Sequence, residues 1–141
     1  MAYRYSRPLD MPRGTHYGNN YWIMQSVKLG RRVTAFSNLE HYNHIRLEMD
    51  PSVIYYCEQP CRASVKMGDG IDRGIVFDVY VCYSDGREEM EEVKYKSELN
   101  GVDDKSIKSQ QQIAAERQWC ADNRISFRVI TEEDLLEPVI Y

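Results

Sequence analysis

The feature that most restricts the fold is a predicted β-hairpin near the middle of the chain. Residues 75–83 and 90–95 are rich in β-branched and aromatic side chains, and a Ser-Asp-Gly loop at residues 84–86 separates them. This pattern is typical of two antiparallel strands joined by a short turn. Asp78 lies inside the first run, where a buried acid costs several kcal/mol unless it is paired or coordinates a metal. The hairpin therefore restricts both the sheet and the position of a site.

The length of the hairpin loop decides which acids share a face of the sheet. A two-residue loop would place Asp78 opposite Val93 and send the side chains of Asp78 and Glu92 to opposite faces. A three-residue loop over residues 84–86, with Gly86 left-handed at a bulge, would instead place Asp78 directly opposite Glu92. Both loops are sterically reasonable, so the pattern leaves both registers open. A shared site for the two acids requires the longer loop.

The second strand adds a lysine to the pair of acids. Glu92 and Lys94 are two residues apart, so their side chains emerge on one face of a strand. Two carboxylates can hold a hard cation such as Mg²⁺, which would polarise a phosphate and lower the pKa of a bound water. A lysine can orient that water or stabilise charge on the phosphate. Phosphodiester hydrolysis is therefore expected, although a structural Asp78–Lys94 ion pair, or a solvated face formed by the acidic run 88–92, would explain the same residues.

The remaining pattern predicts an α/β domain with a mixed central sheet flanked by helices. Ser37 and Glu40 have the spacing of a capping box, so Glu40 has a structural explanation as well as a functional one. The other expected elements are helices at residues 37–49, at 103–123 and after Thr131, and strands at 53–57, 61–67 and 126–130.

An Asp on one strand followed by Glu-x-Lys on the next resembles the PD-(D/E)xK nuclease superfamily. The neighbouring motifs are similar to the N-terminal, catalytic part of the TnsA-type transposon endonucleases. These motifs are Ser-Asn-Leu-Glu at residues 37–40, an Asp-Pro-Ser-Val stretch at 50–53 and Gln-Pro at 59–60. The similarity runs in order over residues 33–135. The family's usual Pro-Asp-Phe is Phe-Asp-Val at residues 77–79, which keeps the carboxylate without the proline.

This resemblance implies a restriction-endonuclease-like fold and a defined set of site residues. It places Glu40, Asp78 and Glu92 near a Mg²⁺ or Mn²⁺ ion and makes Lys94 catalytic. Members of the family carry a further C-terminal domain that contacts a partner ATPase, and this chain ends at Tyr141. We therefore expect a nuclease that works alone or with a different partner. A non-catalytic DNA-binding or assembly subunit, and a nuclease that resolves branched DNA such as Holliday junctions, are the alternatives.

The charge is unevenly distributed along the chain. The net charge is −4, yet residues 1–34 carry six basic side chains and one acid. We therefore expect a basic, aromatic arm at residues 1–32, with little regular structure over residues 1–30, followed by a catalytic domain at 33–141. The arm would supply DNA contacts, although a solvated tail without a partner has the same composition. The basic residues assigned to DNA are Arg4, Arg7, Arg13, Arg31 and Arg32.

Composition also excludes several classes of protein. No apolar run approaches the ~20 residues that a membrane span needs, and the first residues lack a secretory signal. The four cysteines, Cys57, Cys61, Cys82 and Cys120, do not have the spacing of a zinc site and are expected to be reduced thiols. We expect a cytoplasmic protein whose partner is DNA and not a membrane, with a second protein or a homodimer left open.

Overall fold

A four-stranded mixed sheet forms the centre of the molecule. The computed structural model describes residues 3–10 and 21–135. The strand order is β3-β6-β7-β8, with β7 and β8 parallel and the other neighbours antiparallel. The strands of this sheet are β3 (Val53–Glu58), β6 (Val79–Tyr83), β7 (Glu88–Val93) and β8 (Ser126–Ile130). The expected α/β, restriction-endonuclease-like architecture is thereby confirmed.

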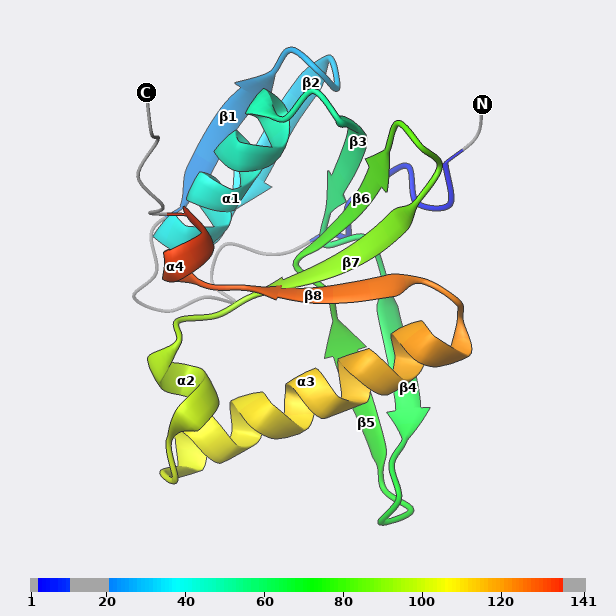
Figure 1. Cartoon of the computed structure of the whole chain (residues 1–141), viewed down its shortest axis with the longest axis vertical. Helices are drawn as coiled ribbons and strands as arrows, with labels where there is room; N and C mark the ends of the chain where they lie inside the picture. The colour runs from blue at the N-terminus through cyan, green and yellow to red at the C-terminus, as the bar shows by residue number, and fades with distance from the viewer. Residues whose placement is uncertain (1–2, 11–20, 136–141) are drawn as a thin grey trace.

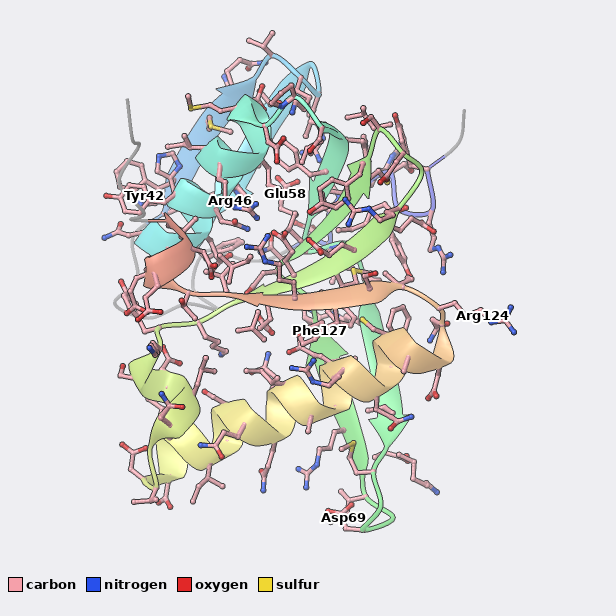
Figure 2. The ribbon with its side chains drawn as sticks, viewed as in Figure 1. Tyr42, Arg46, Glu58, Asp69, Arg124 and Phe127 are labelled. Atoms are coloured by element: carbon pink, nitrogen blue, oxygen red, sulfur yellow. The ribbon has the colours of Figure 1, made fainter. Side chains whose placement is uncertain are left out.

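Helices and two further hairpins surround the central sheet. Figure 1 shows α1 and the β1–β2 hairpin at one end of the molecule and α3 running below β8 at the other. The β4–β5 hairpin passes α3, and Asp69 marks its tip (Figure 2). These elements are β1 (Trp22–Ser26), β2 (Arg31–Ala35), α1 (Asn38–Met49), β4 (Arg62–Lys66), β5 (Asp72–Val76), α2 (Ser97–Asn100), α3 (Asp104–Asp122) and α4 (Glu132–Leu135).

Alternation along β6 divides the core into two buried clusters. Side chains on one face of β6 pack with residues of α1 and β2. Side chains on its other face pack with residues of α3. The first cluster includes Val33, Leu47, Val79, Val81 and Tyr83. The second includes Tyr80, Cys82, Met90, Ala115 and Cys120. The side-chain period of two thus assigns each residue of β6 and β7 to either the α1 side or the α3 side.

The β6–β7 hairpin has the three-residue loop. Val79 pairs with Glu91 and Cys82 with Glu88. The Tyr83 N–H donates to the Arg87 carbonyl at 2.9 Å and closes the turn. Gly86 has φ 91°, the left-handed conformation that the bulge requires. This pairing, which ends at Val79 and Glu91, is the register of the three-residue loop, so the longer of the two predicted loops is the correct one.

The expectation of one continuous strand over residues 75–83 is wrong. The chain leaves the β4–β5 hairpin after Val76 and enters the central sheet at Val79, because its pairing partners change there. The Asp78 N–H still donates to the Glu91 carbonyl at 3.2 Å, and the Gln59 N–H donates to the Asp78 carbonyl at 2.9 Å. The neighbouring segment, which runs from β3 into β4, also breaks at this level. There Gln59 has φ 38° and Pro60 offers no N–H.

The expectation of little regular structure before residue 30 is wrong for β1, which pairs with β2 along five residues of each strand. The short helix α2 was not expected either. The first described residues lie along the body, where the rings of Tyr3 and Tyr55 stack 3.8 Å apart and the Leu9 N–H donates to the Gln59 carbonyl. Within residues 3–10 and 21–135, no helix has the length and apolar character needed to cross a membrane.

Candidate active site

The four residues singled out by the sequence line one pocket of about 490 Å³. Glu40 comes from the first turn of α1, Asp78 from the residue before β6, Glu92 from the end of β7, and Lys94 from the residue after Val93, where β7 ends. The hairpin register and the first turn of α1 therefore bring together side chains that lie far apart in the sequence.

Asp78 and Glu92 form the deepest part of the pocket. The Val93 N–H donates to one Asp78 carboxylate oxygen at 2.6 Å, and Gln112 Nε2 donates to Glu92 Oε2 at 2.7 Å. Burial raises the pKa of Asp78 well above its usual range, and repulsion from Glu92 adds to the effect. Burial also raises the pKa of Glu92. Both carboxyls thus carry a free-energy cost when ionised, and their donors among residues 3–10 and 21–135 are neutral groups.

Glu40 acts as part of a helix cap and also faces the pocket. Ser37 Oγ accepts from the Glu40 N–H and donates to Glu40 Oε2, both at 3.1 Å. Gln59 Nε2 donates to the second oxygen, Oε1, at 3.1 Å. Burial, reinforced by the charge of Asp78, raises the pKa of Glu40 to about 8. The capping explanation is therefore correct, and it is compatible with a second role in the pocket.

Lys94 is half-buried and is one of two lysines that line the pocket, together with Lys105. Its backbone N–H donates to the Ile130 carbonyl at 3.0 Å, which holds this residue beside β8. Its positive charge opposes the rise in the pKa of Asp78 and of Glu92. The ion pairs of the described part of the chain do not include one between Lys94 and Asp78. The alternative of a closed, structural ion pair therefore finds no support in the geometry.

A fourth carboxyl, Glu116 of α3, was missed by the sequence reasoning. It is 0% exposed, and neither carboxylate oxygen has a hydrogen-bond partner of good geometry. Its carboxyl lies against that of Glu92, and burial raises the pKa of Glu116 to about 7. A signal was present, because Ser109, Gln112, Glu116 and Cys120 recur every three or four residues and mark the inward face of a helix.

Two other buried glutamates have arginine partners. Arg46 Nη2 donates to both Glu91 oxygens at 3.0 and 2.9 Å, and Asn43 donates to one of them. Burial still raises the pKa of Glu91 to about 7, and Arg46 opposes the rise. Arg31 donates to both oxygens of Glu58. Figure 2 labels Arg46 on α1 and Glu58 at the end of β3. These pairs hold α1 and β2 to the sheet.

The basic residues assigned to DNA occupy different environments. Arg31 is engaged with Glu58, and Arg4 forms an exposed ion pair with Glu88 at 3.0 Å. Arg7 and Arg32 are exposed. Arg13 lies outside the described residues. The geometry thus gives Arg31 a structural partner and leaves Arg7 and Arg32 on the surface.

The donor set of the pocket has the chemistry that a hard divalent cation prefers, since it offers carboxylate oxygens and no sulfur or imidazole. Over residues 3–10 and 21–135, however, no three His, Cys, Asp or Glu side chains are arranged as a complete metal site. One Asp78 oxygen is occupied by the Val93 N–H, while neither oxygen of Glu116 has a hydrogen bond of good geometry. The residue types suit such a cation, and the carboxyl groups that line the pocket outnumber its lysines.

A mixed sheet flanked by helices, with a carboxylate pair and a lysine at the end of its central hairpin, defines a restriction-endonuclease-like nuclease domain. Residues 50–132 match the TnsA-like endonuclease N-terminal family, and the chain belongs to this family. The resemblance found in the motifs is thus confirmed. The matched segment contains Asp78, Glu92 and Lys94, whereas Glu40 precedes it. A search of curated proteins found no match.

Proposed function

We propose that the chain is a Mg²⁺-dependent DNA endonuclease that hydrolyses phosphodiester bonds in this pocket. The observation that carries the proposal is a set of half-buried and buried carboxyls whose hydrogen-bond donors among the described residues are neutral, in the same pocket as Lys94. Anionic carboxylates that form no ion pair are unstable in a protein interior. A bound cation would stabilise them, and the family supplies the class of reaction.

In the proposed mechanism, Asp78 and Glu92 would hold a divalent cation from the sheet, and Glu40 would hold it from α1. A divalent cation bound there would polarise the phosphate and lower the pKa of a bound water. Lys94 orients the attacking water or stabilises charge on the phosphate oxygens. The water oxygen adds to phosphorus and one bridging P–O bond breaks. The leaving oxygen takes up a proton, which yields a phosphate monoester and a hydroxyl end.

A cleavage assay tests the proposal directly. The protein is incubated with Mg²⁺ or Mn²⁺ and with supercoiled, linear, single-stranded and four-way-junction DNA. We expect cleavage of duplex DNA that EDTA abolishes and that D78N lacks. Preference for the junction would instead identify a resolving nuclease. Binding of DNA without cleavage of any substrate would identify a non-catalytic DNA-binding or assembly subunit and overturn the proposal.

DNA binding requires positive charge, because the pocket itself is acidic. We propose that four cations of the N-terminal arm, Arg4, Arg7, Arg13 and Arg32, contribute phosphate contacts. The free cysteines of the described residues suit the reducing cytoplasm that we propose as the setting.

A further inference from the structure

Helix α3 contains three consecutive glutamines, and they have different environments. Gln110 Nε2 donates to the Gly101 carbonyl at 3.0 Å, and Gln111 is exposed beside β5. Gln112 is half-buried, lines the pocket, and donates to Glu92 at 2.7 Å. The helix thus directs one amide into the site and leaves its two neighbours outside, although the side-chain types are identical.

The hydrogen bond from Gln112 constrains Glu92 without neutralising it. An amide donor is electrically neutral, so the carboxylate keeps its full charge for a cation, whereas an arginine donor would oppose that charge. Glu91, the preceding residue on β7, has an arginine partner in Arg46. The two neighbouring glutamates therefore have opposite kinds of support.

Glu116 lies one helical turn after Gln112 on the same face of α3. It is fully buried, its two oxygens have no hydrogen-bond partner of good geometry, and it stands against Glu92. A glutamine or an apolar side chain would be more stable at such a position in the absence of a cation. Packing alone gives no reason for an acid there, whereas attraction of a cation does.

We propose that α3 completes the metal site: Gln112 is a positioning residue that orients the Glu92 carboxylate, and Glu116 adds negative charge behind it. This inference rests on the proposed function. Groups that orient a metal ligand typically change metal affinity or activity 10–100-fold when they are removed. The two side chains therefore make α3 a functional part of the site as well as a cover for the sheet.

The first test compares Q112M with Q111M in the full chain. The two changes remove the same amide from neighbouring positions of one helix, so Q111M is the matched control. We expect Q112M to weaken Mn²⁺ binding about 10-fold, as measured by calorimetry, and to lower kcat more than it changes the KM for DNA. Q111M should match the parent in both. Parent-like Mn²⁺ affinity and kcat in Q112M, or equal losses in both variants, would overturn the role of Gln112.

The second test uses E116Q, with melting temperatures measured in EDTA and in Mn²⁺. We expect E116Q to melt at a higher temperature than the parent in EDTA, because repulsion with Glu92 is relieved. It should bind Mn²⁺ a few-fold more weakly, and so show a smaller Mn²⁺-induced shift. A lower melting temperature in EDTA with unchanged Mn²⁺ affinity would show that Glu116 is structural.

The parent protein separates failure of this inference from failure of the proposed function. If the parent binds Mn²⁺ and cleaves DNA while Q112M and E116Q behave like it, only the role of α3 is overturned. If the parent neither binds Mn²⁺ nor cleaves DNA, the proposed function fails, and the inference fails with it.

Discussion

Glu91 and Glu92 are neighbours on one strand, yet they occupy opposite environments. Glu91 faces α1, where Arg46 and Asn43 donate to it, and Glu92 faces α3, where its donor is the amide of Gln112. A glutamate paired with an arginine contributes to the attachment of a helix. A glutamate without a cation partner stores electrostatic repulsion that a bound cation can relieve. The two faces of β7 thus separate attachment from proposed catalysis.

The largest expected effect is loss of cleavage on the α3 face. D78N and E92Q should each lower the rate of DNA cleavage by roughly 10³-fold, because each removes a carboxylate proposed to hold the cation that stabilises charge in the transition state. Mn²⁺ should raise the melting temperature of the parent, and D78N should lose this shift.

E91Q is the matched control for E92Q, since it makes the same change on the other face of the strand. It should keep the Mn²⁺-induced shift even where its stability differs from that of the parent. Equal loss of the shift in E91Q and E92Q would show that the two faces are not functionally distinct.

The second effect concerns the α1 face. R46M leaves Glu91 buried without its cation partner, and removal of one member of a buried ion pair costs about 3–5 kcal/mol. Urea unfolding in EDTA should show this loss for R46M, whereas E92Q should unfold at the same or a higher urea concentration than the parent. A stable R46M variant with strongly weakened Mn²⁺ binding would reverse the assignment of the two faces.

The features of the two faces of β7 that could be predicted from the sequence are those that depend on residues close together in the chain. The opposition of Asp78 and Glu92 follows from a local loop, and the start of α1 follows from Ser37, so both could be predicted. The spacing of residues along α3 could have placed Glu116 on the inward face, but its position beside Glu92 could not be predicted, because it depends on how α3 packs against a sheet formed by distant strands. The break at Phe77 was equally hidden, since it arises where the chain changes pairing partners.

The third effect is a dependence of stability on pH in the absence of metal. The pKa of Glu40 is raised from 4.5 to about 8 and that of Glu116 to about 7. Between the unfolded and folded pKa values the folded state holds more protons, so stability falls as pH rises. We expect a decrease of about 2 kcal/mol from pH 6.5 to 8, since one proton corresponds to about 1.4 kcal/mol per pH unit.

This pH window avoids an opposing contribution. Burial lowers the pKa of His44 to about 3, so His44 makes the protein less stable as pH falls below about 6.5. Urea unfolding at pH 6.5 and 8 measures the effect, and saturating Mn²⁺ should remove most of it. Stability that rises over this window in EDTA would contradict the idea that the carboxyls of the pocket are uncompensated.

The smallest effect concerns the arm. Replacement of Arg4, Arg7 and Arg13 by alanine should weaken DNA binding, and each lost phosphate contact should reduce the log–log salt slope by about 0.9. Arg4 already pairs with Glu88, so its share should be small. Cleavage at saturating DNA should stay near the parent rate. An unchanged slope with lower stability would show that the arm serves only to pack along the body.

The loop at residues 84–86 has a consequence for insertions and deletions. Exposed loops usually accept changes of length, and this one lies at the end of the hairpin away from the pocket. If one residue were lost and the turn did not shorten with it, the pairing of β7 would shift by one position and each of its side chains would turn to the opposite face. Glu91 would then face α3, and Glu92 would face α1 and Arg46. We therefore expect related chains to vary this loop freely in composition, and in length only where the turn absorbs the change and the pairing of β7 is kept.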